Sequence, residues 1–361
     1  MRSAAPRGSI EKACDFLFEQ AGIEFAEICH AMVFPHAAGF TGSSEEHCSE
    51  TYSRSVLARV LSDIGASRGF EHPLFRALPE IIERAAERVA AARLTDREGG
   101  WSYFPDLPEL PPDADSLAAA ALLFARAAPR HIDLCARPIE LVIGALRSDG
   151  GIGTWIFSPN DPLSARQSME RGVERYWGDT VDVEVCAHFY LALLAVDRQR
   201  HESLARKAAT YILSAQNENG TWDATWYWGL AYPTGLCLEF LQSLGEGNEP
   251  TRGAVDFFTN SQNSDGGWGW GGRASVPLET ALAATLISRS GAGVPKEVHR
   301  GAIDFLLATQ SGDGSWEGSP WIKMEVGRAH GTATHTLSYG STTLTTAMCL
   351  RTLLDLDGSA A

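Results

Sequence analysis

Two aspartates, Asp113 and Asp115, stand directly after a pair of prolines and directly before a long apolar stretch, in the run PPDADSLAAAALLFARA. A carboxyl group can act as a general acid if it keeps its proton near neutral pH, and burial in an apolar cavity favours the protonated form. Aspartate is also a preferred residue at the start of a helix, where it accepts backbone N–H groups. The motif therefore predicts an acid catalyst or, alternatively, a helix cap.

The same small turn occurs five times: a polar residue, a short stretch rich in Gly, Asp and Asn, then a Gly followed closely by a Trp. The five turns span residues 97–101, 147–155, 216–222, 262–268 and 310–316, and the last three are a little under fifty residues apart. A repeat at a nearly fixed spacing predicts a fold built from repeated supersecondary units. The first turn lies just ahead of the two aspartates.

Each turn separates two kinds of helix. The stretches before the turns have apolar residues three and four apart, which predicts helices with one exposed face, whereas those after the turns are richer in small and apolar residues, which predicts buried helices. We expect outer helices near residues 10–18, 75–92, 132–146, 201–215, 251–261 and 296–309, and inner helices near 50–64, 115–127, 184–196, 234–244, 279–289 and 343–354. Six such pairs can close into a ring. The expected fold is all-α, a single (α/α)6 barrel domain over residues 1–361.

Composition excludes several classes of protein. The net charge of −15, with 30 Lys and Arg against 45 Asp and Glu, argues against a nucleic-acid partner. The apolar runs are shorter than the roughly twenty residues that span a bilayer, and the N-terminus lacks the apolar core of a signal peptide. We therefore expect a soluble, cytoplasmic protein. The seven cysteines are odd in number and scattered, which favours reduced, buried thiols.

The turns QNENGTW, QNSDGGW and QSGDGSW resemble the QW motifs of class II terpene cyclases, the squalene-hopene and oxidosqualene cyclase group. The turns that end at Trp101 and Trp155 have Arg where that family has Gln. The run Asp113-Ala114-Asp115-Ser116 also resembles the family's Asp-x-Asp-Asp motif, with Ser116 in place of the last Asp. By this resemblance Asp115 is the general acid that protonates an alkene or epoxide, and Asp113 and Ser116 position its proton.

The resemblance also implies a substrate class. Large members of the family have two or three helical domains, whereas this chain has room for one barrel, and so looks like the single-domain cyclases that act on prenylated aromatic acids or similar meroterpenoid precursors. The implied reaction converts a linear polyprenyl chain, on such a head group or on a diphosphate, into a polycyclic product through carbocations. No cofactor is implied, except Mg²⁺ if the substrate is a diphosphate. Peripheral membrane contact would help to take up the hydrophobic substrate, and no obligate protein partner is evident.

Aromatic side chains in the loops before the inner helices could shelter a carbocation, because aromatic faces attract cations. We place Trp228 and Tyr339 on the cavity wall, with Trp101 and Phe157 as further candidates, and we expect the turn residues Trp222, Trp268 and Trp316 to be structural clamps, as in the family. Cations in two other loops could hold a carboxylate or diphosphate head group, although a solvated surface is the simpler explanation. These cations are Arg166, Arg171, Arg175, Lys323, Arg328, His330 and His335.

Three alternative functions stay open. The barrel also resembles protein prenyltransferase β subunits, which bind catalytic zinc, and Glu184 and Cys186 with His188 or His335 offer similar ligands. Glycosidases of (α/α)6 topology use carboxylate pairs, which Asp115 could form with Glu184 or Glu279. A non-catalytic isoprenoid-binding protein would bind a prenylated ligand and return it unchanged.

Overall fold

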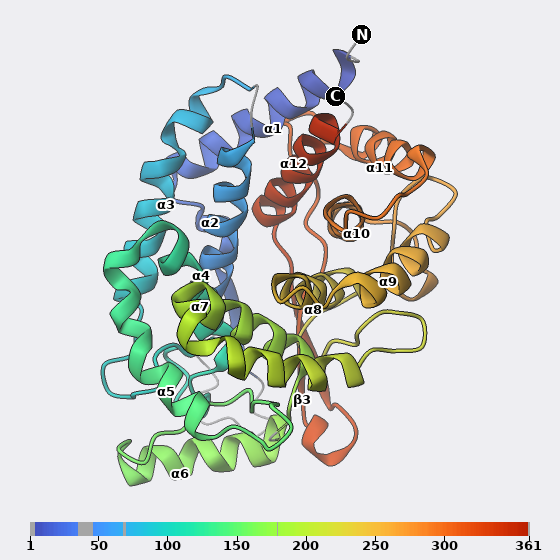
Figure 1. Cartoon of the computed structure of the whole chain (residues 1–361). Helices are drawn as coiled ribbons and strands as arrows, with labels where there is room; N and C mark the ends of the chain where they lie inside the picture. Colours follow the sequence, from blue (N-terminus) through green and yellow to red (C-terminus); the bar gives the residue numbers. More distant parts are fainter. Residues whose placement is uncertain (1–3, 35–45, 68–69, 179, 360–361) are drawn as a thin grey trace.

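The computed structural model of the chain describes residues 4–34, 46–67, 70–178 and 180–359, and it is mostly helical (Figure 1). Six helices form an inner ring: α2 (Thr51–Ala66), α4 (Ala114–Ala127), the first half of α7 (Val183–Ser214), α8 (Ala231–Ser243), α10 (Pro277–Arg289) and α12 (Thr342–Ser359). Each contacts the next, and α12 contacts α2, which closes the ring. The prediction of an all-α barrel of helix pairs is confirmed.

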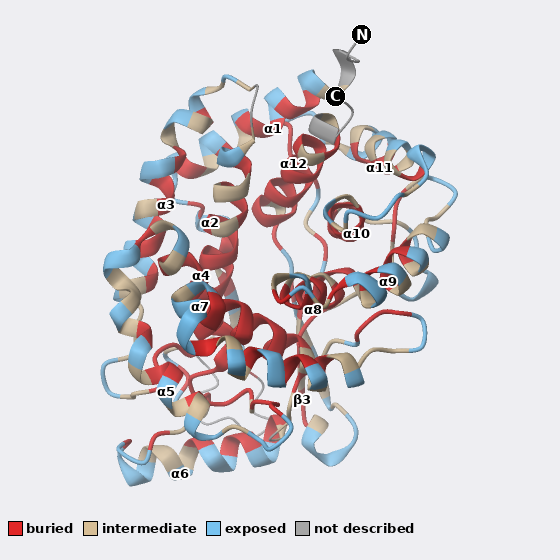
Figure 2. Cartoon of the chain, in the orientation of Figure 1, coloured by how far each residue is buried: buried red, intermediate tan, exposed pale blue. Residues whose placement is uncertain are grey.

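The outer helices cover this ring. They are α1 (Ala4–Gly22), α3 (Pro73–Ala91), α5 (Ala136–Gly144), the second half of α7, α9 (Asn248–Asn260) and α11 (Lys296–Thr309). The two halves of α7 are separate helices of the barrel, because Asp197 between them has extended backbone angles of φ −155° and ψ 91°. Burial follows the same division: in α4 every residue from Ala114 to Phe124 is buried, whereas the outer helices expose one face (Figure 2).

The Gly-Trp turns fasten each outer helix to its neighbours. The indole N–H groups of Trp222, Trp268 and Trp316 each donate to a carbonyl oxygen of the outer helix before the turn, at 2.7 to 2.8 Å. The glutamine that opens the turn reaches the next outer helix instead. Gln310 Nε2 donates to the Ser9 carbonyl oxygen at 2.9 Å, so the last turn is joined to α1. The turns therefore link the end of the chain to its beginning and complete the ring.

A glycine in each of these turns touches the backbone of the next outer helix. At Gly314 the φ angle is +90°, and an added Cβ would lie 2.2 Å from the Lys12 carbonyl oxygen. We expect Gly314→Ala to destabilise the fold by roughly 2–4 kcal/mol, because a left-handed backbone costs an L-residue about 1–2 kcal/mol and α1 must also move away. Gly312→Ala is the matched control, since no atom lies within 4 Å of its added Cβ. Urea unfolding of both variants measures the difference, and equal stabilities would contradict it.

The loops between the barrel helices contain strands and short helices that the sequence pattern did not predict. Strand β1 (His30–Val33) pairs antiparallel with β2 (Glu46–Ser49), and β3 (Ile322–Val326) pairs antiparallel with β4 (His335–Tyr339). Helix α6 (Leu163–Gly172) and a single π-turn, η4 (Val173–Trp177), lie where we expected an irregular loop. Short 3-10 turns complete the described elements: η1 (Ala26–Ile28), η3 (Pro129–Cys135), η5 (Trp270–Gly272) and η6 (Arg328–His330). No helix in the described ranges is long and apolar enough to cross a membrane.

The cysteine prediction was wrong for one pair. Cys29 and Cys48 form a disulfide, with their Cα atoms 6.2 Å apart. Cys29 directly precedes β1 and Cys48 lies in β2, opposite Ala31, so the antiparallel pairing of the two strands brings the cysteines together. The other five cysteines, at positions 14, 135, 186, 237 and 349, are free and buried, as predicted.

Candidate active site

A small pocket lies where α2 and α4 begin, and both predicted aspartates are in its wall. It encloses about 40 Å³. The lining residues are His30, Tyr52, Tyr103, Leu110, Asp113, Asp115, Thr154, Trp155, Trp226, Tyr227, Ile322 and Met324. Backbone hydrogen bonds hold the aspartate segment beside the second Gly-Trp turn: Ala114 donates to the Thr154 carbonyl oxygen, and Ile156 to that of Pro112, both at 2.8 Å.

Asp113 is the helix cap that the sequence allowed. Its Oδ1 accepts the Ser116 backbone N–H at 2.7 Å, at the first turn of α4. Its other oxygen, Oδ2, is buried without a hydrogen-bond partner in the described structure, as is the Ser116 hydroxyl. Burial raises the pKa of the Asp113 carboxyl to about 7, and the nearby charge of Asp115 adds to this, although the hydrogen bond from the Ser116 backbone N–H opposes it.

Asp115 has a different environment, which capping does not explain. Its Oδ1 lies 2.6 Å from Nδ1 of His188, one turn into α7, and its Oδ2 accepts the hydroxyl of Tyr227 from the loop before α8. Both carboxyl oxygens are therefore occupied by groups that can donate to the anion. The Asp115 side chain is 12% exposed and that of His188 only 1% exposed, so little water competes for these hydrogen bonds. The side chain of Asp115 is held in place from two directions.

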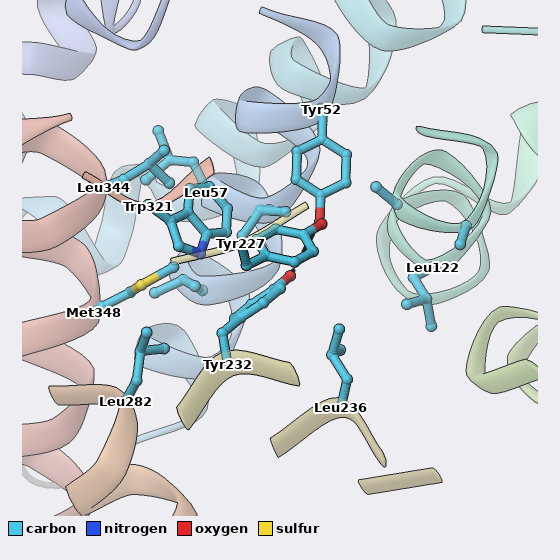
Figure 3. Close-up of a cluster of buried hydrophobic side chains, with 14 of the residues drawn as sticks. Tyr52, Leu57, Leu122, Tyr227, Tyr232, Leu236, Leu282, Trp321, Leu344 and Met348 are labelled. Carbon is cyan, nitrogen blue, oxygen red and sulfur yellow. Dashed lines mark hydrogen bonds between the residues drawn. The ribbon is translucent and has the colours of Figure 1, made fainter. Parts of the chain in front are cut away.

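Tyr227, which contacts Asp115, belongs to a cluster of aromatic side chains (Figure 3). The Tyr227 hydroxyl also bonds that of Tyr52, and the Tyr52 hydroxyl lies 3.2 Å from that of Tyr232 on α8. Burial raises the pKa of Tyr52 and Tyr227 well above the ordinary value, and the charge of Asp115 adds to this, so both stay neutral. Trp321 packs on all three rings, with centroids 5.2 to 6.0 Å away. The cluster fills the centre of the barrel beside Asp115.

Two tryptophans form a second wall of the pocket. Trp155 and Trp226 meet edge to face, with ring centroids 5.5 Å apart. The Trp226 indole donates to Asp182 Oδ2 at 2.9 Å, and the guanidinium carbon of Arg328 lies 4.4 Å from its ring centroid. Asp182 and Arg328 thus hold the Trp226 ring in place. Arg328, one of the loop cations considered as a head-group ligand, supports this wall.

The four predicted wall residues are not among those that line the pocket. Trp101 is fully buried and donates to the Val89 carbonyl oxygen of α3 at 2.7 Å, just as Trp222, Trp268 and Trp316 donate to the outer helices before their turns. Phe157 packs against the core, and half-buried Trp228 donates to Ser338 Oγ at 3.0 Å. Tyr339 comes nearest: its ring stacks on that of His30, which lines the pocket, with centroids 4.6 Å apart.

Glu184 and Glu279, the possible glycosidase partners of Asp115, accept backbone hydrogen bonds instead. Glu184 accepts the backbone N–H groups of Thr225 at 2.6 Å and Trp226 at 3.0 Å, and Glu279 accepts those of Leu230 and Ala231 at the start of α8. Neither lines the pocket, so neither forms a carboxylate pair with Asp115 there.

The candidate zinc ligands are also separated. The Cys186 thiol faces the Ile152 backbone and His188 binds Asp115, while His335 lies on β4 next to Thr334. Within the described ranges, no three His, Cys, Asp or Glu side chains group as metal ligands would.

Three other loop cations also have protein partners. Arg166 lies 3.5 Å from Glu170, Lys323 lies 3.8 Å from Glu325, and the guanidinium of Arg175 lies 5.5 Å from the Tyr176 ring centroid. None of the seven predicted loop cations lines the pocket.

Stability should depend on pH through three buried carboxyls. Burial raises the pKa values of Asp113, Glu184 and Glu279 to about 7, 8 and 7. Each of these groups binds its proton more tightly in the folded chain than in the unfolded chain, so they contribute stability below about pH 4 that is lost as pH rises through about 8. We expect Tm to fall between about pH 5 and 8.5, and to fall less in Asp113→Asn, whose amide oxygen can still accept the Ser116 N–H. Thermal unfolding followed by circular dichroism tests this, and an equal fall in both proteins would contradict it.

Sequence reasoning missed the two partners of Asp115. His188 was considered only as a zinc ligand, and Tyr227 only as one of several loop aromatics. A signal for His188 was present: it lies four residues after Glu184, so both lie on the same face at the start of one inner helix. No pattern in the sequence indicated Tyr52, because its role depends on the ring that brings α2 beside α4 and α8.

Comparisons with known proteins identify the family and the fold. The family model of the squalene-hopene cyclase C-terminal domain matches residues 90–330. Squalene–hopene cyclase from Zymomonas mobilis is 26% identical over 245 residues, which cover 63% of this chain and 36% of the relative. Copalyl diphosphate synthase from Streptomyces cyslabdanicus is 33% identical over 147 residues, covering 37% of this chain and 26% of the relative. The chain thus matches about a third or less of the length of these relatives.

A solved structure has the same fold over nearly its whole length. A variant of type II terpene cyclase MstE from Scytonema, in complex with geranylgeranyl dihydroxybenzoate, superposes with a TM-score of 0.70. It is 18% identical, and the match covers 98% of this chain and 97% of that one. The family match spans well over half of the chain and includes both aspartates, the five Gly-Trp turns and the residues that line the pocket, apart from His30 and Tyr52. This chain is therefore a member of the squalene-hopene cyclase C-terminal domain family, within the class II terpene cyclase superfamily.

Proposed function

We propose that the chain is a class II terpene cyclase in which Asp115 protonates the terminal alkene of a linear prenyl chain. The observation that carries this proposal is the position of Asp115: it faces an aromatic pocket, and His188 and Tyr227 hold its two carboxyl oxygens. A simple helix cap needs neither contact. Asp113 already caps α4, which leaves Asp115 available for chemistry.

Protonation forms a C–H bond at the alkene and breaks the O–H bond of Asp115, which leaves a carboxylate and a carbocation. An alkene is a weak base, so the step depends on stabilising the carboxylate that remains. Hydrogen bonds to a charged group are worth about 1.5–3 kcal/mol each, and two such donors face Asp115. The internal alkenes of the chain then add to the cation in turn, and loss of a proton from the last cation gives a cyclic isomer of the substrate.

The pocket wall supplies what the cation needs. The rings of Trp155, Trp226 and Tyr52 offer negative faces without a nucleophile that would trap the cation, and a desolvated cation–π contact contributes about 2 kcal/mol. Burial lowers the pKa of His30 to about 4, so it stays neutral at pH 7 and adds no positive charge to this wall. Asp113, with its pKa near 7, faces the same pocket and helps to position the proton.

The pocket must enlarge when substrate binds. It encloses about 40 Å³, whereas pockets for drug-sized ligands span about 300–1,000 Å³. Ile322 and Met324 of the β3–β4 hairpin close one side. The hairpin pairs through its backbone with residues 226–228, and its tip contacts η4, where Gly327 donates to the Tyr176 carbonyl oxygen and Arg328 to that of Trp177. Movement of this hairpin would open the pocket without breaking the ring of helices.

The substrate is a linear prenyl chain on an aromatic acid or on a diphosphate. The first head group is that of the ligand bound to MstE, and the second is that of the product in the name of the Streptomyces relative. Incubation of the full chain with both kinds of substrate, followed by mass spectrometry and NMR of the extract, tests the proposal. We expect a product of unchanged mass with fewer alkenes. Recovery of every substrate unchanged, despite measurable binding, would indicate an isoprenoid-binding protein instead.

A further inference from the structure

A second, larger pocket lies deeper along the inner helices, beyond the tyrosine cluster. It encloses about 230 Å³ between α2, α8, α10 and α12. Tyr232 borders it, while Tyr52 borders the pocket of Asp115, so the bonded pair of hydroxyls lies between the two cavities. Arg59 lies seven residues after Tyr52 on α2, which places it about 10 Å further along the helix axis. This pocket is therefore separate from the acid.

The wall of this second pocket is aliphatic at one part and cationic at another. Leu236, Leu282 and Met348 contribute apolar surface next to Tyr232 (Figure 3). The cationic part consists of Arg59 on α2, Arg289 on α10 and Arg351 on α12. Three long cations from three different helices converge on one cavity: Arg351 is buried, Arg59 is half-buried and Arg289 is exposed at its rim.

Carboxylates contact this cationic part of the wall. Arg289 bonds Asp63 at 3.0 Å and Asp355 at 2.9 Å, and Arg351 lies 3.6 Å from the same Asp63. Glu239, which also lines the pocket, lies 3.4 Å from Arg126. Four guanidinium groups thus share three carboxylates: Arg59, Arg126, Arg289 and Arg351 face Asp63, Glu239 and Asp355. The three arginines that line the cavity share Glu239 with Arg126, which does not line it.

Two of the arginines also have buried N–H groups without an acceptor in the described structure. These atoms are Nη1 of Arg59 and Nε of Arg351. Burial, together with the charge of Arg289, lowers the pKa of Arg351 to about 10, which still leaves it charged at pH 7. A buried charged donor without a partner is costly, and an anion that accepted these N–H groups would remove that cost.

We propose that this second pocket binds the anionic head of a small amphiphile, a phosphate or carboxylate joined to a short aliphatic chain. The unpaired guanidinium N–H groups would bind the head, and the aliphatic wall would bind the chain. A metal ion does not fit among three arginines, and an inorganic anion alone would leave the apolar wall uncovered. The binding site does not depend on the cyclase activity proposed for Asp115.

A substitution at Gly235 should fill this pocket without disturbing the fold of α8. It lies within α8 and lines the cavity, and no atom lies within 4 Å of an added Cβ. Gly235→Leu should therefore occupy the cavity and leave the helix intact. The matched control is Gly8→Leu, at an equally open position of α1 on the exposed surface. Arg351→Gln, checked for folding by its thermal unfolding, tests the cation directly.

Isothermal titration of the full chain with octyl phosphate, octanol and inorganic phosphate tests the proposal. We expect octyl phosphate to bind at least about tenfold more tightly than either fragment, the equivalent of a single charge-assisted contact. Gly235→Leu and folded Arg351→Gln should each weaken the binding of octyl phosphate by about tenfold or more, whereas Gly8→Leu should leave its affinity unchanged. Equal binding of octanol and octyl phosphate, or unchanged binding in Gly235→Leu, would overturn the proposal.

A turnover experiment then identifies the source of the head group. If the amphiphile is the cyclase substrate itself, octyl phosphate will compete with it and Gly235→Leu will lose turnover. If the ligand is a separate molecule, octyl phosphate will bind the substrate-saturated protein with unchanged affinity. Binding in Asp115→Asn should match the wild type, so failure of the acid assignment and failure of the second site are distinguishable.

Discussion

Replacement of Asp115 by asparagine is expected to lower the rate of cyclisation by roughly 10³-fold, because general acid catalysis contributes about 10²–10⁴-fold and no other acid in the pocket is held in the same way. The amide can still accept from His188 and bond Tyr227, so the variant should fold and still bind a prenyl substrate. Single-turnover kinetics with product quantified by mass spectrometry would measure the loss.

Asp113→Asn is the matched comparison. Its amide oxygen retains the cap on α4, and Asp115 keeps both of its partners, so we expect a loss of no more than about tenfold, the size of one ordinary hydrogen-bond contribution. If Asp113→Asn proved far more damaging than Asp115→Asn, the roles of the two carboxyls would have to be exchanged. The raised pKa of Asp113 makes that a meaningful comparison.

The second large effect concerns His188. His188→Ala is expected to reduce kcat by about 10- to 100-fold with little change in KM, because it removes one donor of about 1.5–3 kcal/mol from the carboxylate formed by proton transfer. His188→Asn places an amide N–H near the position of Nδ1 and should recover part of the rate. Steady-state kinetics of the two variants, with circular dichroism to confirm folding, would measure this.

A purely structural role for His188 predicts a different result. In that case both variants would lose stability and activity together, and asparagine would recover neither. A rate unaffected by alanine would show that Asp115 does not depend on this contact. The comparison of KM with kcat separates a positioning role from damage to the pocket, since the His188 donor acts on the carboxylate, whereas loss of its edge-to-face packing on Tyr52 in the pocket wall would raise KM.

The helices could be predicted from sequence because each has a local signature. The small and apolar composition of 115–127 marks a helix buried on all sides, and the five Gly-Trp turns divide the chain into pairs. The break in α7 was predicted in the same way, since the character of the sequence changes from inner to outer near Asp197. Placing Asp113 and Asp115 at the start of an inner helix followed from the same pattern.

The pocket wall could not be predicted, because it depends on contacts between distant segments. His188 meets Asp115 across 73 residues, and Tyr227 meets it across 112. We predicted no strands in segment 322–339. It forms the β3–β4 hairpin, in which Ile322 and Met324 line the pocket, whereas Tyr339 does not line it and stacks on His30. For Trp101 the repeat did indicate a structural role, since this residue occupies the same place in its turn as the structural tryptophans.

The central claim is that a proton from Asp115 starts the reaction, and isotope incorporation tests it most directly. The full chain would be incubated in D₂O with a prenyl substrate that it cyclises, and the product examined by mass spectrometry and ²H NMR. The account predicts one non-exchangeable deuterium per product molecule, at the carbon that was the terminal alkene, and roughly 10³-fold slower formation of labelled product by Asp115→Asn. A cyclic product without deuterium, or labelled product formed at the wild-type rate by Asp115→Asn, would contradict it.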